Sequence, residues 1–472
     1  MKKLFIFSII FFLSVQIYSQ QWYAMGNIDT LGPNGNKGVC TINQFNNKIT
    51  IGGFFKSSGT IILNSIARWN SNQWQPMSTG VWDNASAQGE GSVVGFSKYH
   101  NKLYCVGGFE GAGGSVFNSN HYAYNIAKWD TIDWYYLTQP GDGFNQGAGA
   151  VGVYHNNLYA GNFAGTAFDS SGIIAAQGIV KWNDTVFSAV GQLAGDFPPG
   201  YFGAMAFTNF NNQLVVGGYF TSINGTPYGT YNGIATWNDT VWSVMGNGFN
   251  NAVLALTVFN GEVYAGGIFD SSRDGSTVLN HIAKWNGTTW VQVGEGLNDT
   301  VYALTVDSVH NKLYAGGGFT QTGLGVPAKH IAEWTGTNWQ EVGSGTNADI
   351  RALYSKDGNL YIEGTFTRVG NLQASLIACW CVNSPLGINE NNKENDINIY
   401  PNPFTFETTI SFSTEQTNTT IKIIDMLGKE IKALNFTGTQ CTIEKGTMQA
   451  GIYFVQITDA NKNIVNRKIV VQ

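Results

Sequence analysis

The chain has 472 residues, of which 59 are glycine, 14% are aromatic and only 12% are charged, and its formal net charge is −6. A chain of this length can bury a large core, and this composition is typical of an all-β protein with many tight turns. The sequence contains no cluster of Lys and Arg with interleaved aromatic residues, which excludes the usual basic nucleic-acid-binding proteins and leaves no nucleic-acid partner to expect.

Residues 1–20 predict a secretory signal peptide. Lys2 and Lys3 precede an apolar run from Leu4 to Val15, and a small residue follows near the expected cleavage point. The alternative is a transmembrane anchor, which the run disfavours because it is shorter than the roughly 20 residues that cross a bilayer. We therefore expect a mature chain without a transmembrane segment.

A short phrase, Ile-(Ala/Val)-x-Trp, recurs seven times with steps of 46 to 60 residues. Its copies end at Trp69, Trp129, Trp182, Trp237, Trp285, Trp334 and Trp380. Residues 301–342 show the whole unit most clearly, as four short β-type runs separated by turns. Such a unit, with a Gly-Gly pair in its middle, is typical of a propeller blade. The sequence therefore predicts a seven-bladed β-propeller of four-stranded blades over residues 21–382.

The seventh unit lacks a fourth strand after Trp380, whereas a lone phrase from Trp22 to Gly26 precedes the first unit. We predict that this N-terminal phrase supplies the outer strand of the last blade and closes the ring through hydrogen bonds. An open stack of repeats is the alternative, but the polar capping units that it needs are not present in the sequence. The glycine pair is incomplete in two units, where Asn162 and Glu363 stand.

The C-terminal part carries a second, separate signal. Residues 383–396 are polar and irregular, which indicates a linker, and residues 397–472 contain alternating β-type runs. The second segment resembles the C-terminal sorting domain of the type IX secretion system of Bacteroidetes. The residues that carry the resemblance are Pro401, Asn402, Pro403, Asp425, Gly428, Lys429, Gly451 and Tyr453.

This resemblance implies a small immunoglobulin-like β-sandwich that is read as an export signal by the type IX machinery and its sortase. It also implies a location outside the cell or on the outer-membrane surface. An ordinary sandwich domain with no sorting role is the alternative. Whether the domain is removed, and whether the product is anchored or released, stays open at this point.

The repeats themselves are similar to kelch and galactose-oxidase-like propellers, since aromatic residues follow the Gly-Gly pair. They depart from kelch repeats because the two aromatics are only five residues apart, as at Trp285 and Trp290. This resemblance implies the fold alone. No copper-ligand set, phosphate loop, nucleophile motif or zinc motif is present in the sequence, so we expect no cofactor, no metal site and no identifiable catalytic residue.

Histidines and cysteines are few. His100, His155 and His310 occupy one hairpin-turn position of the repeat, and His281 and His330 precede the third strand, so we expect turn or edge residues. An Asp-(Ser/Thr)-apolar pattern resembles the O-glycosylation acceptors of Bacteroidetes, although Asn-Asp-Thr is equally good turn chemistry. Its acceptor residues are Thr30, Thr131, Thr185, Thr240, Thr300 and Ser308. Among the five cysteines, Cys40 and Cys381 flank the predicted closure, and we expect a disulfide between them.

A ligand is expected on the face formed by the connections after the second and fourth strands, because these loops are long and variable. Aromatic residues with Asn, Gly and Asp neighbours suit stacking on sugar rings, although the same residues suit packing of the loops over the blades. The candidates are Trp82, Phe117, Tyr122, Phe144, Phe168, Phe197 and Tyr201. We interpret the chain as a secreted or surface-displayed, non-catalytic binding or adhesion module for a glycan or extracellular polymer. An extracellular polysaccharide-directed enzyme and a purely structural surface protein are the alternatives.

Overall fold

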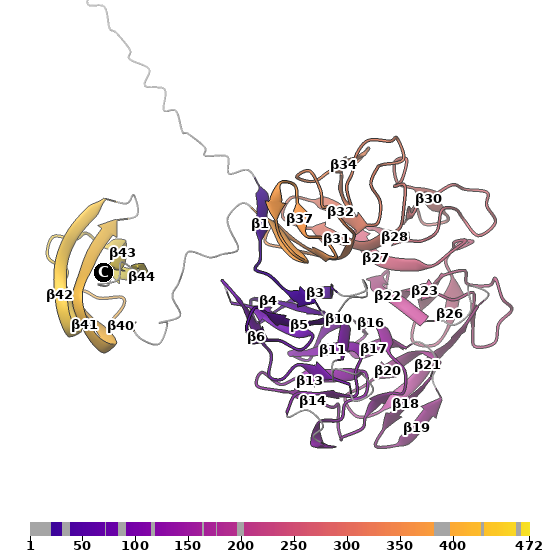
Figure 1. Cartoon of the computed structure of the whole chain (residues 1–472), viewed down its shortest axis with the longest axis horizontal. Helices are drawn as coiled ribbons and strands as arrows, with labels where there is room; N and C mark the ends of the chain where they lie inside the picture. Colours follow the sequence, from indigo (N-terminus) through magenta and orange to yellow (C-terminus); the bar gives the residue numbers. More distant parts are fainter. Residues whose placement is uncertain are drawn as a thin grey trace, which may run out of the picture. The chain divides into compact units, whose positions relative to one another are not determined.

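The computed structural model describes residues 20–30, 38–70, 72–83, 91–114, 119–162, 165–175, 177–195, 203–381, 397–425, 429–458 and 464–472. Residues 1–19 of the predicted signal peptide and the whole predicted linker lie outside these ranges. The described elements are β-strands, apart from one turn of 3-10 helix at Ser119–His121. The chain divides into two compact units, residues 1–385 and 386–472 (Figure 1).

The described residues of the first unit form seven antiparallel sheets with one shared strand plan. Sheet 1 contains β3 (Val39–Phe45), β4 (Lys48–Gly53), β7 (Ile66–Trp69) and β8 (Trp74–Pro76), and sheet 2 contains β10 (Ser92–Tyr99), β11 (Lys102–Gly108), β13 (Ile126–Trp129) and β14 (Trp134–Tyr135). Sheet 3 contains β16 (Ala148–Tyr154), β17 (Asn157–Asn162), β20 (Gly178–Trp182) and β21 (Phe187–Ala194), and β24 (Ser222–Ile223) extends it.

The remaining four sheets continue the plan. Sheet 4 contains β22 (Gly203–Phe210), β23 (Gln213–Tyr219), β25 (Ile234–Trp237) and β26 (Trp242–Val244), and sheet 5 contains β27 (Val253–Phe259), β28 (Glu262–Gly267), β29 (Ile282–Trp285) and β30 (Trp290–Gln292). Sheet 6 contains β31 (Val301–Asp307), β32 (Lys312–Gly317), β33 (Ile331–Trp334) and β34 (Trp339–Glu341), and sheet 7 contains β35 (Ile350–Lys356), β36 (Asn359–Gly364), β39 (Ile377–Cys381) and β1 (Gln21–Ala24).

Short strands occupy the connections that enter the first strand or leave the second strand of a sheet. They are β2 (Asp29–Thr30), β5 (Phe55–Ser58), β6 (Ile61–Ile62), β9 (Val81–Trp82), β12 (Gly111–Ala112), β15 (Gly143–Phe144), β18 (Thr166–Asp169), β19 (Gly172–Ala175), β37 (Arg368–Val369) and β38 (Leu372–Gln373). Because strand direction alternates within a sheet, these connections all lie at one end of the sheets, which we call the loop face.

The first strands of the seven sheets form the centre of the unit. Each packs beside the first strands of the sheets before and after it, and β35 of sheet 7 packs beside β3 of sheet 1. Each of these strands has a β-bulge near its start, which leaves one residue unpaired with the second strand and re-aims its side chain. The bulge residues are Cys40, Val94, Gly149, Met205, Leu254, Tyr302 and Arg351. All seven line one cavity of about 500 Å³, which we call the ring mouth.

The N-terminal strand pairs with the last sheet, as the sequence predicts. β1 runs antiparallel to β39, with Trp22 opposite Trp380. The two indole rings lie 5.0 Å apart between centroids, and Trp22 Nε1 donates a hydrogen bond to the carbonyl of Gly343 in sheet 6. Other fourth strands repeat this contact with the preceding sheet, since Trp290 donates to Met245 O and Trp339 donates to Val293 O. The tryptophans therefore join neighbouring sheets as well as filling their own.

Glycines at the end of the second strand allow the sheets to approach closely, as expected. A Cβ atom added at Gly52 would lie 2.5 Å from Val93 in the next sheet, and one added at Gly316 would lie 2.6 Å from Ile350. Both distances are too short for real contacts. Glu363 occupies the equivalent position in sheet 7 and is fully buried.

The cysteine pairing differs from the expected one. Cys381 forms a disulfide with Cys379, and Cys40 is a free thiol. The expected Cys40–Cys381 bond is therefore wrong. Residues two apart in a strand point to the same face, so Cys379 is the nearer partner of Cys381, with a Cα–Cα distance of 5.5 Å.

The second unit is a small β structure with its own core. It contains β40 (Ile397–Tyr400), β41 (Glu407–Asp425), β42 (Glu430–Glu444), β43 (Gly451–Thr458) and β44 (Ile464–Val471), and the long β41 pairs with β40, β42 and β43. Asn402 bridges to β44, because its side chain donates to Lys468 O and accepts from Val470 N. Asp425 and Lys429 exchange hydrogen bonds across a turn. Gly428 lies outside the described residues.

Candidate functional site

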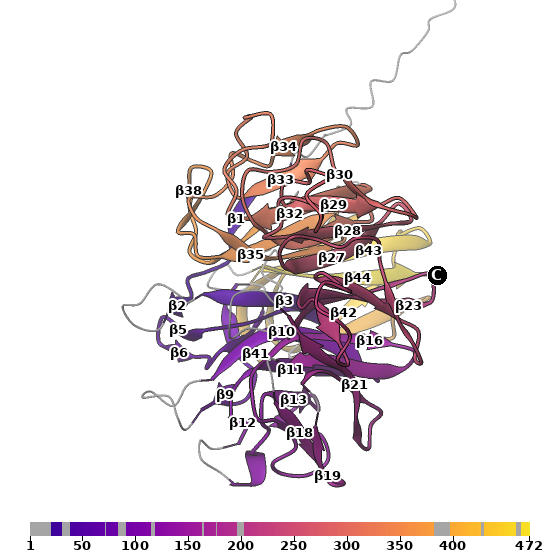
Figure 2. The ribbon, with the colours of Figure 1, turned by 90° about the vertical axis from the view of Figure 1, so that its right-hand side faces the viewer.

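A cavity of about 540 Å³ opens on the loop face between sheets 2 and 3, and we call it the sheet 2–3 cleft. This volume suits a small-molecule or oligosaccharide ligand. The cleft is lined by Asp83, Gly108, Phe109, Glu110, Tyr124, Asn125, Phe144, Asn145, Gln146, Gly147 and Phe168. The short strands β9, β12 and β18 carry or flank several of these residues (Figure 2).

One wall of the cleft comes from the β9–β12 ribbon. Trp82 pairs with Gly111, and Glu110 N donates a hydrogen bond to Trp82 O. Asp83 follows Trp82 and Glu110 precedes Gly111, so the two carboxylates come from facing positions at the end of the ribbon. The fold therefore places two acids in one cleft that are 27 residues apart in the sequence.

The opposite wall is fixed to the first by hydrogen bonds. Asn125 Nδ2 donates to Phe144 O at 2.6 Å, and Asn125 Oδ1 accepts from Phe109 N at 2.9 Å. Phe144 N donates in turn to Tyr124 O at 2.8 Å. The described walls are thus held by buried polar bonds, which favours a preformed site.

Tyr124 and Phe168 supply half-buried aromatic rings to the cleft. Burial raises the pKa of the Tyr124 phenol, and the charges of Glu110 and Tyr122 raise it further. Tyr124 therefore stays protonated at neutral pH and can donate a hydrogen bond. The cleft combines apolar ring faces with carboxylate and amide groups, which is the chemistry that binds a polyhydroxylated ligand.

The structure corrects part of the predicted ligand set. Trp82 and Phe144 are 1% and 0% exposed, so they are not exposed stacking surfaces. Each lies in a short ribbon folded onto the sheets, and Trp82 packs edge-on against Tyr122 at 5.2 Å. Tyr122 is half-buried and does not line the cleft, whereas Phe168 and the buried Phe144 do.

Other predicted positions lie outside the described residues, namely Phe117, Phe197 and Tyr201. The residues missed by sequence reasoning are Asp83, Glu110, Tyr124, Asn125, Asn145 and Gln146. Asp83 and Glu110 immediately flank the ribbon strands, but no periodic signal marks that pairing. The sequence signal that points to this region is the position of Asp83 and Asn145 directly after the predicted Trp82 and Phe144.

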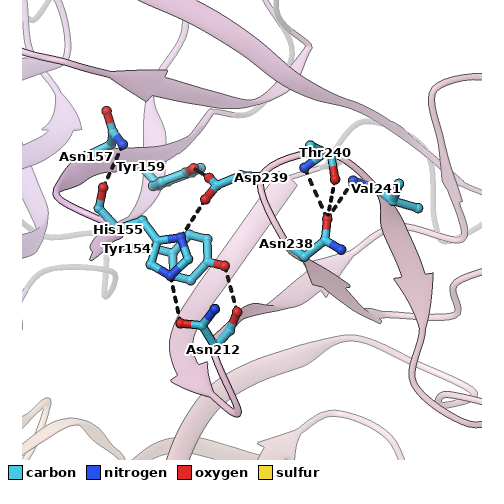
Figure 3. A network of polar contacts seen from close by, with 9 residues as sticks. All are labelled: Tyr154, His155, Asn157, Tyr159, Asn212, Asn238, Asp239, Thr240 and Val241. Carbon is cyan, nitrogen blue, oxygen red and sulfur yellow. Dashed lines mark hydrogen bonds and ion pairs between the residues drawn. The ribbon is translucent and has the colours of Figure 1, made fainter.

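Two of the histidines join neighbouring sheets rather than serving a cavity. His155 Nδ1 lies 2.5 Å from Asp239 Oδ2, and His155 Nε2 lies 2.9 Å from Asn212 Oδ1 in sheet 4 (Figure 3). Tyr159 OH donates to the second oxygen of Asp239 at 2.9 Å. His100 repeats this pattern with Asp184 and Asn156 of sheet 3. We call each arrangement a histidine clamp.

The clamps shift the pKa values of their members. The hydrogen bond to Asn212 and that to Asp239 raise the pKa of His155, and the equivalent bonds to Asn156 and Asp184 raise that of His100. Burial acts to raise the pKa of Asp239, but hydrogen bonds from His155 and Tyr159 outweigh it, and the pKa falls. Both histidines stay about 40% exposed, as expected for turn residues.

The predicted O-glycosylation residues differ in accessibility. Thr131, Thr185, Thr240 and Ser308 are exposed, Thr300 is only 7% exposed, and the side chain of Thr30 lies outside the described set. Thr185 and Thr240 donate to Asn183 and Asn238 in Asx-type turns. The pattern thus has a structural role in these turns, and glycosylation stays a prediction.

The described residues contain no group of three or more His, Cys, Asp or Glu side chains arranged to hold a metal ion. No helix in the described ranges is long and apolar enough to span a bilayer.

The first unit is all-β and propeller-like, and the second unit identifies the export route. Residues 398–472 match the secretion system C-terminal sorting domain. The chain therefore carries a type IX sorting tail, which implies interaction with the secretion machinery and export to the cell surface or the extracellular space.

A curated protein matches part of this chain. An endo-acting ulvan lyase of Formosa agariphila is 33% identical over 116 residues, which is 24% of this chain and 22% of the lyase. This chain thus matches less than a quarter of that protein's length.

Two solved structures are weakly similar to this chain. PorZ, a surface component of the type IX secretion system of Porphyromonas gingivalis, is similar with a TM-score of 0.27 and 12% identity over 92% of this chain and 75% of PorZ. The β-propeller domain of Cps50 from Myceliophteria thermophila has a TM-score of 0.29 and 11% identity over 70% of this chain and 99% of that domain. Both scores are low, so neither likeness bears on the function of this chain.

Proposed function

We propose that this protein is a surface-displayed or secreted seven-bladed β-propeller that binds a glycan in the sheet 2–3 cleft without transforming it. The proposed organisation is a signal peptide in residues 1–20, the propeller in residues 21–382 and a linker in residues 383–396. Residues 397–472 then form an immunoglobulin-like sandwich that acts as the sorting domain.

The ring arrangement supports the propeller. Seven sheets share one plan, their first strands adjoin in a closed series, and the bulge residues all reach one cavity. The pairing of β1 with β39 joins the two ends of the repeat region in one sheet. This is the arrangement that removes unpaired edges from a ring of blades.

The sheet 2–3 cleft carries the binding proposal. Phe168 offers an apolar ring face, while Tyr124 and Asn145 offer hydrogen-bonding groups at the same cavity. Sugars present apolar ring faces flanked by hydroxyl groups, so they complement such a surface. The fixed walls reduce the entropy lost on binding, because the described polar bonds exist without ligand.

The test is affinity electrophoresis of the full chain in gels that contain a panel of algal, plant and host polysaccharides. We expect at least one polysaccharide to retard the chain, and Phe168→Ala to weaken retention by about tenfold. Tyr228→Ala is the matched control, because Tyr228 is 67% exposed and does not line the cleft. Equal losses in both variants, or no retention by any polymer, would reject the proposal.

A polysaccharide-directed enzyme is the second candidate, and the pair of carboxylates in the cleft favours it. Asp83 and Glu110 provide the two acids that acid–base cleavage of a glycosidic bond requires. The partial match to an ulvan lyase points in the same direction. Released fragments from wild type, abolished in both Asp83→Asn and Glu110→Gln, would establish the enzyme and replace the binding proposal.

A purely structural surface protein is the third candidate. It predicts neither retention nor products with any polymer, and an unchanged fold in every cleft variant.

A further inference from the structure

The ring mouth is a second cavity on the loop face, with a different chemistry from the sheet 2–3 cleft. All seven repeats contribute one bulge residue to it, but these residues differ widely in type. Val94, Met205 and Leu254 are apolar, Gly149 has no side chain, and Arg351 is the one bulge residue with a permanent charge. The seven bulge positions are thus structurally equivalent, but the side chains that occupy them differ.

Arg351 is held in place by two neighbours. Its guanidinium lies over the ring of Tyr302, 4.0 Å from the centroid, and its Nη2 donates to Asp349 Oδ2 at 3.0 Å. The first contact fixes the plane of the guanidinium, and the second occupies part of one edge. Among the described residues, the other guanidinium N–H groups have no hydrogen-bond partner, and the side chain is 40% exposed.

Among the residues that the structure describes, Asp349 is the one polar neighbour that occupies part of the Arg351 guanidinium. Burial raises the pKa of the Cys40 thiol to about 12, with a further contribution from Glu363, so this thiol is uncharged at neutral pH. Asp349 carries a negative charge, but it is already bonded to Arg351 and lies 3.8 Å from His330. Arg351 is thus the one residue with a permanent charge among the described residues that line the mouth, and Val94, Met205 and Leu254 supply apolar groups beside it.

We propose that the ring mouth binds a small organic carboxylate with an apolar body. The free edge of the Arg351 guanidinium would receive the carboxylate in a bidentate pair, and Leu254 and Met205 would contact the apolar part. A cavity of about 500 Å³ accommodates a ligand of about ten to fifteen heavy atoms. This site is independent of the glycan proposal, because the two cavities share no lining residue.

The test uses the full chain and 4-phenylbutyrate as probe, followed by saturation-transfer NMR and titration. The neutral amide of the same acid serves as the isosteric comparison. We expect the carboxylate to bind and the amide to bind at least about tenfold more weakly, since a charge-assisted bidentate bond is lost. Arg351→Gln should weaken carboxylate binding by a similar factor.

Two further variants keep the result specific. Arg368→Gln removes the same charge from an exposed position in β37 that does not line the mouth, and it should bind the probe as wild type does. Leu254→Trp fills the mouth while leaving Arg351 intact, and it should abolish binding. Equal binding of acid and amide, unchanged binding in Arg351→Gln, or no binding of the acid up to about 10 mM would overturn the proposal.

Discussion

We predict that Glu363 makes the stability of the first unit depend on pH. Its side chain is 0% exposed, and neither carboxyl oxygen has a hydrogen-bond partner among the described residues. It stands where Gly52 and Gly316 allow neighbouring sheets to approach. Burial raises the pKa of this carboxyl well above its ordinary value of 4.5, so the folded chain holds its proton more tightly than the unfolded chain does.

The direction of the effect follows from proton linkage. Above pH 4.5 the unfolded chain releases the Glu363 proton while the folded chain retains it, so the folded state binds more protons and stability falls as pH rises. The slope is about 1.4 kcal/mol per pH unit until the folded carboxyl also ionises. Glu363→Gln keeps the shape and removes the titration, so it should match wild type near pH 4 and become progressively more stable by comparison toward pH 7.

The assay is urea unfolding, followed by tryptophan fluorescence, across this pH range. The difference in unfolding free energy between Glu363→Gln and wild type should grow with pH. Glu295→Gln removes an exposed acid in the same unit and should follow wild type throughout. A Glu363→Gln difference that stays constant with pH would refute the reasoning, because it would show that the carboxyl titrates alike in both states.

Three further predictions concern closure, the clamps and the cysteines. Trp22→Ala should destabilise the first unit by about 3 kcal/mol, because the packing of the indole ring is lost. Trp22→Phe should cost about 1 kcal/mol through loss of the hydrogen bond to Gly343. Urea denaturation measures both changes, and wild-type stability in Trp22→Ala would argue against closure by the N-terminal strand. The raised pKa of His155 means that its clamp stabilises the fold below pH 6.5 and that this contribution is lost as pH rises through the folded pKa. The melting temperature of His155→Gln should therefore fall below that of wild type at acidic pH and approach it at alkaline pH, and a gap that widens with pH would contradict the sign. Thiol titration in denaturant should find three free thiols before reduction and five after it; five before reduction would exclude the Cys379–Cys381 bond.

The strand plan was predictable from the sequence because it depends on local repetition. The Ile-(Ala/Val)-x-Trp phrase marks third strands, and the lone Trp22 phrase marks the strand that pairs with β39. The phrase recurs because two tryptophans pack against each other at the turn between the third and fourth strands. This is a local contact, so the sequence shows it without knowledge of long-range contacts. The number of blades and the sandwich topology of the second unit remain part of the proposal.

The candidate site was predictable only as a face of the unit. Asp83 and Glu110 line one cleft because the short strands β9 and β12 pair with each other, and such a pairing has no periodic pattern. For Trp82 and Phe144 the sequence leaves both stacking on a ligand and packing over the blades open, because aromatics in long loops carry no sign of whether the loop folds back; the structure buries both. The partner of Cys381 is not predictable from the sequence, because residue positions near the closure do not show to which face of β39 each cysteine side chain points.

The most direct test of the central claim is a crystal structure of the full chain with an oligosaccharide cut from whichever polymer retards it. We predict that the sugar occupies the sheet 2–3 cleft, with a ring against Phe168 and hydrogen bonds to Tyr124 and Asn145. An oligosaccharide bound elsewhere, with the cleft filled only by solvent, would contradict the assignment of this cleft as the binding site.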